Sequence, residues 1–173
     1  MHYLTVSFSH KNSDIAAREK LAFTETSKEE ALATLTCEDT KISEAIIVST
    51  CNRVEILAST NDTAKASTEI FEMLSRHSGL SIEELEGRAD VFENEGAVHH
   101  LFAVTSSLDS VVIGETQIAG QIKDAFKFAY DRGHCSQKLS RVMHYAFKCA
   151  ADVRNQTEIA KKPISVASVA VDK

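Results

Sequence analysis

Alternating apolar and polar residues predict short strands in the first half of the chain. The run from Tyr3 to Phe8 alternates with period two, as expected for a strand that buries every second side chain. Two apolar runs, residues 45–48 and 54–58, flank a short polar segment and predict two strands joined by a tight turn. Residues 89–92 predict a fourth strand.

Helical patterns lie between these strands. One helix is expected from about Ile15 to Leu21. Residues 27–30, Ser-Lys-Glu-Glu, have the capping-box pattern of serine followed three positions later by glutamate, which predicts that the next helix starts there. Apolar residues at helical spacing predict another helix over about residues 64–77. The predicted element order is βαββαβ, the ferredoxin-like arrangement.

The pattern becomes helical after about Asn94. Three apolar stripes follow each other, and each predicts an amphipathic helix whose apolar face must pack on the others. Their members are Val98, Leu101, Phe102, Thr105 and Leu108; then Ile118, Ile122, Ala125, Phe126 and Ala129, ended by Gly133; then Leu139, Val142, Met143, Ala146, Ala150 and Val153. We therefore predict an α+β fold, with a βαββαβ subdomain at residues 1–94 and a helical subdomain at residues 95–160.

A cysteine stands in the turn between the second and third predicted strands. Residues 49–53 read Ser-Thr-Cys-Asn-Arg, so Cys51 has a hydroxyl on one side and the amide and guanidinium of Asn52 and Arg53 on the other. A nearby positive charge favours the thiolate, and a turn on a rigid scaffold holds a nucleophile exposed but fixed. The alternative is a buried structural cysteine at a strand end, and the residues alone leave both open.

Composition limits the class of protein. The chain has 173 residues, of which 43% are hydrophobic, and this is enough for a substantial core. It has no apolar run of ~18 residues, and its first residues lack the basic and apolar regions of a secretory signal. Its four cysteines show no CxxC spacing. We expect a cytoplasmic protein with neither a membrane span nor a metal site.

The charge is unevenly distributed. The net charge of −6 combines −10 over residues 1–110, where 9 Lys and Arg face 19 Asp and Glu, with +4 over residues 111–173. The acidic first part argues against general nucleic-acid binding. The basic second part suits one polyanionic partner, or is a set of solvated helix faces.

Two groups of polar residues are candidates for chemistry in the second half. His99 and His100 lie off the apolar stripe of their predicted helix, so either could act as a base or an orienting group for a thiol. Gly114 precedes the next predicted helix and would place Glu115 in its first turn. Gln117 and Gln121, four positions apart, face the same way, although an ordinary polar helix face would show the same pattern.

No cofactor motif is present. The six glycines form neither GxGxxG nor a phosphate-binding loop, so we expect no dinucleotide site within this chain. Residues 163–171 are apolar and small and stop shortly before the last residue. We interpret residues 161–173 as the start of a linker to another element.

Four segments carry a resemblance to a known family. They are residues 49–55 (Ser-Thr-Cys-Asn-Arg-Val-Glu), 100–102 (His-Leu-Phe), 108–110 (Leu-Asp-Ser) and 114–123 (Gly-Glu-Thr-Gln-Ile-Ala-Gly-Gln-Ile-Lys). In this order and spacing they resemble the N-terminal catalytic domain of glutamyl-tRNA reductase. The resemblance implies two further domains, one that binds NADPH and one that dimerises, to which residues 161–173 would lead.

The resemblance also implies a reaction and a set of site residues. Cys51 would attack the ester of glutamyl-tRNA to form a thioester, which NADPH reduces to glutamate-1-semialdehyde in the first step of tetrapyrrole (porphyrin, haem) synthesis. His100 matches a histidine needed for full activity, as a base or a positioning group. The residues that match the substrate-binding segments are Thr50, Asn52, Arg53, Ser110, Glu115, Thr116, Gln117 and Gln121. Among them, Arg53 suits the substrate carboxylate and Glu115 its ammonium group.

Partners and departures follow from the same resemblance. The full-length protein would be a homodimer that passes its product to glutamate-1-semialdehyde aminomutase. Ser107 stands where the family usually has glycine, Thr116 replaces a usual proline, and residues 6–13 depart from the family's usual opening. Two alternatives stay open at this point: an RNA-binding module that uses the sheet, and a haem-responsive regulatory domain.

Overall fold

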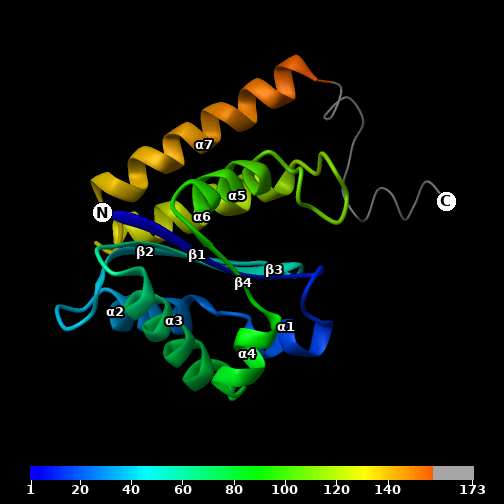
Figure 1. The fold of residues 1–173 in the computed structure, drawn as a ribbon. Coiled ribbons are helices and arrows are strands. Elements are labelled where there is room, and N and C mark those ends of the chain that lie inside the picture. The colour runs from blue at the N-terminus through cyan, green and yellow to red at the C-terminus, as the bar shows by residue number, and fades with distance from the viewer. Residues whose placement is uncertain (158–173) are drawn as a thin grey trace.

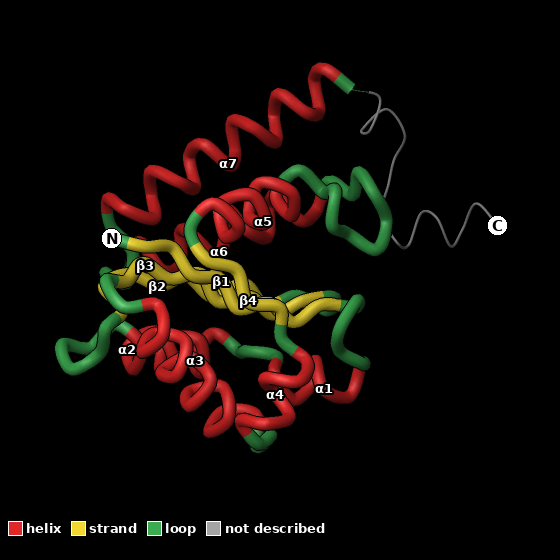
Figure 2. The backbone as a smooth tube through the Cα atoms, viewed as in Figure 1, coloured by secondary structure: helices red, strands yellow, loops and turns green. Residues whose placement is uncertain are grey.

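The structure is a computed structural model that describes residues 1–157. Its strands are β1 (His2–Ser9), β2 (Ile42–Ser49), β3 (Arg53–Thr60) and β4 (Asp90–Glu93). Its helices are α1 (Ile15–Leu21), α2 (Glu25–Leu35), α3 (Thr63–Ser78), α4 (Ile82–Arg88), α5 (Glu95–Thr105), α6 (Gln117–Asp131) and α7 (Gln137–Gln156). They form three layers, with the sheet between α1–α4 on one face and α5–α7 on the other (Figures 1 and 2).

The sheet has the predicted topology. Its strand order is β2-β3-β1-β4, and every neighbouring pair is antiparallel. A βαββαβ chain gives this strand order when both of its helical connections pack on the same face of the sheet. The predicted α+β fold class is therefore confirmed. In the β1–β3 pair, Ser7 stands directly opposite Glu55.

Both faces of the sheet are buried. Successive side chains of a strand point to opposite faces of the sheet, and here α1–α4 cover one face and α5–α7 the other (Figure 1). Every residue of β3 is therefore buried. On β1, Leu4, Val6 and Phe8 alternate with the buried polar residues Thr5 and Ser7. One continuous apolar cluster includes residues from both helical layers.

The helices of the second half thus pack on the sheet as well as on each other. The sheet and these helices share one apolar core. The division into residues 1–94 and 95–160 stays a prediction. The predicted linker at residues 161–173 lies outside the described residues.

One helix start in the first half was predicted wrongly, and one helix was not predicted. α2 begins at Glu25, and its N-cap is Thr24, whose hydroxyl accepts from the Ser27 backbone N–H while the Ser27 hydroxyl accepts from the Thr24 N–H. Ser27 is thus the inner partner of the capping box instead of its start. The sequence pattern also missed α4. Ser81 caps this seven-residue helix together with Glu84, but it buries one residue, Leu85, and so has no apolar stripe.

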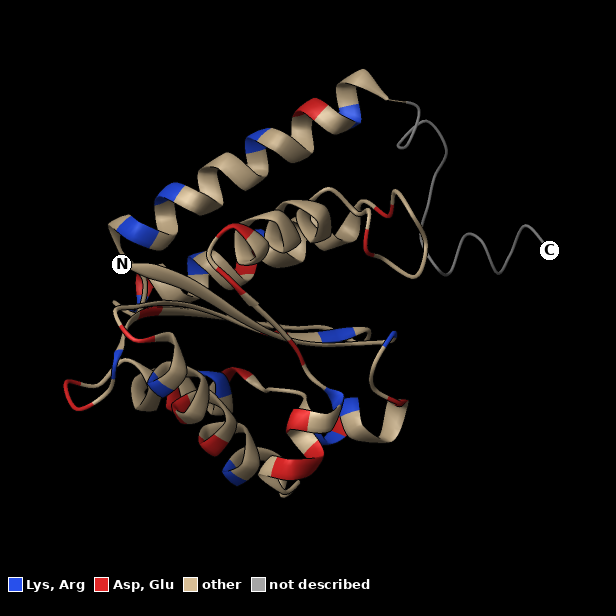
Figure 3. Cartoon of the chain, viewed as in Figure 1, with Lys and Arg blue, Asp and Glu red and all other residues tan. Residues whose placement is uncertain are grey.

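The charge is distributed unevenly over the helices. Acidic side chains outnumber basic ones on α2 and α4, α1 and α3 carry both signs, and α7 carries four Lys and Arg residues and one Asp (Figure 3). Among residues 1–157, no helix combines the length and the apolarity needed to cross a membrane.

Candidate active site

Cys51 lies at the tip of a turn that is fixed by its neighbours. The Thr50 N–H donates to the Arg53 carbonyl at 2.8 Å, and the Thr50 hydroxyl accepts from the backbone N–H groups of Asn52 and Arg53, each at 3.2 Å. The Asn52 carbonyl also accepts from the His10 N–H at 3.2 Å. Cys51 is nevertheless exposed. The alternative of a buried structural cysteine is therefore wrong.

A pocket opens beside Cys51. One wall is the turn itself, and the other comes from a loop after α5 and from the first turns of α6. The lining residues are Thr50, Cys51, Asn52, Arg53, Ser110, Val111, Glu115, Gln117, Ile118 and Gln121. Eight of the ten predicted site residues thus lie together, although about 60 positions separate the two walls in the sequence. Thr116 and His100 are the two that do not line this pocket.

Glu115 reaches the pocket from a different position than predicted. α6 begins at Gln117 with Thr116 as its N-cap residue, so Glu115 precedes the helix instead of lying in its first turn. Thr116 is exposed and makes no capping bond with its side chain. Gln117 and Gln121 do face the pocket together, as their spacing predicted.

Arg53 is the most buried charged residue of the pocket wall, with 2% of its surface exposed. Its Nη1 donates to Glu55 Oε1 at 2.8 Å, and its Nη2 donates to the Asp109 carbonyl at 2.7 Å and to Asp109 Oδ2 at 3.1 Å. Sequence reasoning missed both carboxylates as members of the site. A charged residue in the middle of an apolar strand was the available signal for Glu55.

Glu55 joins Arg53 to His100. Its Oε1 accepts from the Ser7 hydroxyl at 2.7 Å, from Arg53 at 2.8 Å and from His100 Nε2 at 2.7 Å. Burial opposes ionisation of Glu55, but the hydrogen bond and charge of His100, the charge of Arg53 and the Ser7 bond outweigh it and lower the pKa of the carboxyl. An ionised carboxylate only accepts hydrogen bonds, so His100 Nε2 carries the proton.

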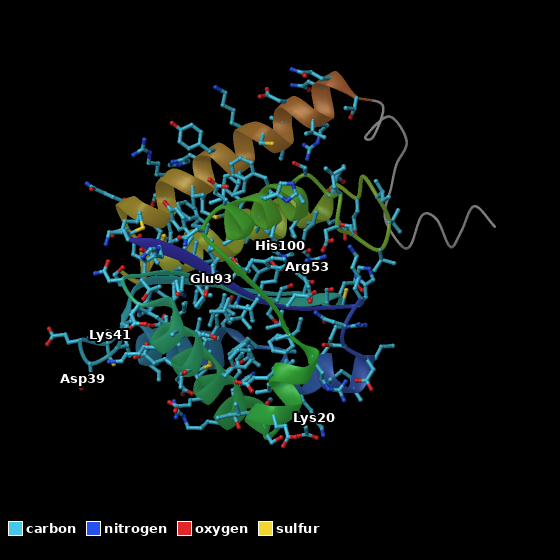
Figure 4. All side chains as sticks on the ribbon, in the orientation of Figure 1. Lys20, Asp39, Lys41, Arg53, Glu93 and His100 are labelled. Atoms are coloured by element: carbon cyan, nitrogen blue, oxygen red, sulfur yellow. The ribbon has the colours of Figure 1, made fainter. Side chains whose placement is uncertain are left out.

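His100 is oriented inward, contrary to the prediction that it lies off the buried face of its helix. Its ring stacks on Phe92 with 4.3 Å between ring centroids, and its side chain is 11% exposed. Figure 4 shows His100 and Arg53 between the sheet and the α5–α7 layer. His99, in contrast, is exposed. His100 therefore reaches the Cys51 pocket only through Glu55 and Arg53.

Comparison with known proteins identifies the family. The family model described as "Glutamyl-tRNAGlu reductase, N-terminal domain" matches residues 6–157. The chain belongs to the glutamyl-tRNA reductase family. It is 59% identical over 173 residues to the glutamyl-tRNA reductase of Sulfurimonas denitrificans and 60% identical over 173 residues to that of Wolinella succinogenes. Each alignment covers 100% of this chain and 40% of the relative.

A solved structure of a glutamyl-tRNA reductase has the same fold. The glutamyl-tRNA reductase from Methanopyrus kandleri superposes with a TM-score of 0.77 at 28% sequence identity, over 98% of this chain and 38% of that chain. The chain thus spans about 40% of the length of its curated relatives.

One departure from the family's usual sequence changes the hydrogen bonds of the loop between α5 and α6. Ser107, where glutamyl-tRNA reductases usually have glycine, has φ of +64°, in the left-handed region that favours glycine. Its hydroxyl donates to the Glu115 carbonyl, and its own carbonyl accepts from the Gly114 N–H at 3.1 Å. The Ser107 hydroxyl thus joins the two ends of the loop between α5 and α6 through a hydrogen bond that a glycine could not make.

The described residues do not fit the NADPH that the glutamyl-tRNA reductase family implies. Dinucleotide sites form at the carboxyl ends of parallel strands, whereas all strand pairs of this sheet are antiparallel. In the same part of the chain, no three His, Cys, Asp or Glu residues are grouped so that they could hold a metal ion.

Proposed function

We propose that this chain carries the acyl-transfer site of a glutamyl-tRNA reductase. The Cys51 thiolate attacks the ester carbonyl that links glutamate to the 3′ end of glutamyl-tRNA. The carbon–sulfur bond forms, the carbon–oxygen ester bond breaks, and the 3′ oxygen of the tRNA leaves with a proton from solvent. The product on the protein is a glutamyl thioester of Cys51.

The observation that carries this proposal is the exposed Cys51 thiol at a fixed turn, in one pocket with four polar side chains of the opposite wall. Ser110, Glu115, Gln117 and Gln121 supply a hydroxyl, a carboxylate and two amides. Such groups suit a small substrate that has an ammonium group, a carboxylate and a reacting carbonyl. A fixed nucleophile beside such a pocket favours acyl transfer through orientation of the ester.

Arg53 and Glu115 recognise the charged ends of the glutamyl group in this proposal. The guanidinium has five N–H groups, and three of its hydrogen bonds go to Glu55 and Asp109. These bonds occupy Nη1 and Nη2, so the Nε–H serves the substrate carboxylate. Glu115, on the opposite wall, pairs with the substrate ammonium group.

His100 acts as a positioning residue in this proposal. Its Nε2 is bound to Glu55, and Glu55 in turn holds Nη1 of Arg53. The histidine therefore sets the direction of the guanidinium instead of taking a proton from Cys51.

The other half of the family reaction, reduction by NADPH to glutamate-1-semialdehyde in tetrapyrrole synthesis, is assigned to no residue among 1–157. The homodimer, transfer to the aminomutase and the cytoplasmic location stay predictions.

The covered sheet argues against the RNA-binding alternative. It required a sheet face open to single strands, and α1–α4 and α5–α7 cover both faces (Figure 1). The haem-responsive alternative stays an untested prediction.

The proposal is tested by acylation of this chain with glutamyl-tRNA that carries radiolabelled glutamate. We expect label on the peptide that contains Cys51, released by hydroxylamine as thioesters are, and no label on the Cys51→Ser variant. Cys37→Ser is the matched control, because Cys37 is also an exposed cysteine. Wild-type chain without label, or with label on another cysteine, would overturn the proposal.

Iodoacetamide gives a second test without tRNA. We expect Cys51 to react faster than Cys37, although both thiols are exposed, and a glutamate analogue to slow Cys51 alone. Burial raises the pKa of the Cys135 thiol to about 11, so Cys135 serves as the unreactive internal reference. Equal rates at Cys51 and Cys37, unchanged by the analogue, would contradict a substrate site beside Cys51.

A further inference from the structure

The loop at residues 106–116 forms part of the pocket but has little apolar anchorage. It supplies Ser110, Val111 and Glu115 to the pocket wall. Three of its large apolar side chains are nevertheless exposed: Leu108 at 49%, Val111 at 49% and Ile113 at 61%. Hydrophobic burial, which holds most segments of a domain in place, therefore contributes little between residues 108 and 113.

Asp109 is the polar anchor in the middle of this loop. Its carboxylate pairs with the Arg53 guanidinium at 3.1 Å and, on its other oxygen, with the Lys11 ammonium. Its carbonyl accepts a further bond from Arg53 at 2.7 Å. Arg53 is the first residue of β3, and Glu55 on the same strand holds its guanidinium. Lys11 belongs to the segment after β1. Asp109 thus links the loop at residues 106–116 to the sheet through Arg53 and to the segment after β1 through Lys11.

The two cations hold Asp109 in its charged form. Burial opposes ionisation of Asp109, but hydrogen bonds and charges from Lys11 and Arg53 outweigh it and lower the pKa of the carboxyl. The partners differ in exposure, since Arg53 is 2% exposed and the Lys11 side chain is 55% exposed. The Arg53 contact should therefore contribute more than the solvent-screened Lys11 contact.

We propose that Asp109 is a positioning residue, supported by Lys11, that keeps the loop at residues 106–116 closed against the Cys51 pocket. Without it, Ser110, Val111 and Glu115 lose their fixed distance from Cys51. This inference rests on the proposed function only for its consequence in acylation. The closure of the loop itself is a property of the unliganded chain.

The first test is amide hydrogen exchange of residues 107–115 in the unliganded chain. We expect about tenfold faster exchange in Asp109→Asn, a change that corresponds to ~1.4 kcal/mol, with the rest of the chain unchanged. Lys11→Met should give about a two- to threefold increase, because its contact is solvent-screened, and Lys11→Arg should restore the wild-type rate. Unchanged exchange in both Asp109→Asn and Lys11→Met would overturn the proposal.

Matched controls come from a surface ion pair elsewhere in the chain. Lys127 and Asp131 pair at 2.7 Å on α6, and both are exposed. Lys127→Met and Asp131→Asn make the same chemical changes and should leave exchange in the loop unaltered. If Asp109→Asn does not fold, Lys11→Met and its arginine rescue still decide the question, because Lys11 is mostly exposed.

The second test is the concentration dependence of Cys51 acylation by glutamyl-tRNA. We expect Asp109→Asn to raise the half-saturating concentration about tenfold, with a smaller effect on the maximal rate. Tighter binding by Asp109→Asn would mean that Asp109 competes with the substrate for Arg53, and would overturn the proposal. Faster exchange in the variant combined with no acylation of wild type would leave the loop anchor intact and reject the proposed function instead.

Discussion

Replacing Glu55 by glutamine removes one buried charge and leaves the shape of the side chain nearly unchanged. Glu55 is 4% exposed, and its Oε1 accepts from three donors, Ser7, Arg53 and His100. Glutamine keeps one oxygen acceptor, but it has no charge to balance the guanidinium of Arg53, which is 2% exposed. The substitution therefore leaves a buried cation with Asp109 as its remaining charged partner.

The expected cost follows from this burial. Breaking a buried ion pair by removing one partner costs about 3–5 kcal/mol, because the other charge stays desolvated. Asp109 remains as a charged partner of Arg53, and glutamine keeps one acceptor oxygen. We therefore expect Glu55→Gln to cost about 3 kcal/mol, the lower end of this range. Arg53→Met combined with Glu55→Gln should cost less than the sum of the single variants by at least about 1 kcal/mol, since neither charge is then left alone.

The pH dependence has a definite sign. The pKa of Glu55 in the folded protein lies below its ordinary value of 4.5. Its contribution to stability is therefore fully present above that value and is lost as the pH falls through the folded pKa. Wild type should lose stability in acid more steeply than Glu55→Gln, which has no carboxyl at this position.

Urea unfolding followed by circular dichroism, at pH 7 and at several acidic pH values, measures both quantities. Glu83→Gln on α4 is the matched control, because Glu83 is exposed and should change stability by less than about 0.5 kcal/mol. A cost below about 1 kcal/mol for Glu55→Gln, with an unchanged acid dependence, would refute the argument that this carboxylate balances a desolvated guanidinium.

Two further predictions concern stability away from the pocket. Glu44 on β2 accepts from three backbone N–H groups at the start of α7, at 2.6, 3.1 and 3.1 Å, so Glu44→Ala should destabilise the chain by about 1–2 kcal/mol and Glu44→Gln by less. Equal melting temperatures for Glu44→Ala and wild type would contradict this capping role. Gly79 ends α3 with φ of +78°, so Gly79→Ala should cost about 1 kcal/mol. Gly87, inside α4 with open space around it, should instead gain about 0.5–1 kcal/mol as alanine. Shifts of the same sign in the two glycine variants, measured by thermal unfolding, would contradict the backbone argument.

Periodicity located the elements well where they bury a regular face. α1 was predicted with the bounds that the structure has, and α3 within one residue at each end. The failures occur where local polar bonds outweigh the apolar pattern. Thr24 and Ser27 start α2 three residues before the predicted position, and α4 depends on Ser81 and Glu84 with a single buried side chain. Such short capped helices carry little periodic signal.

The sequence indicated which residues line the pocket, but not which hydrogen bonds and ion pairs hold them in place. The resemblance indicated eight of the residues that line it, because those residues occur in recognisable local motifs. The partners of Arg53 were not predictable in this way. Glu55 stands two positions away on the same face of β3, but Asp109 is 56 positions away and Lys11 pairs with it across 98 positions.

The sequence by itself determined the strands, most helices, their order and the position of Cys51 in a turn, because these depend on neighbours within a few residues. Only the tertiary structure decided that α5–α7 cover the second face of the sheet, that His100 is oriented inward to Glu55, and that Asp109 ties a loop to Arg53 and Lys11. The physical reason is that a buried charge is tolerated only where a partner neutralises it. Which partner does so depends on the packing of segments far apart in the chain.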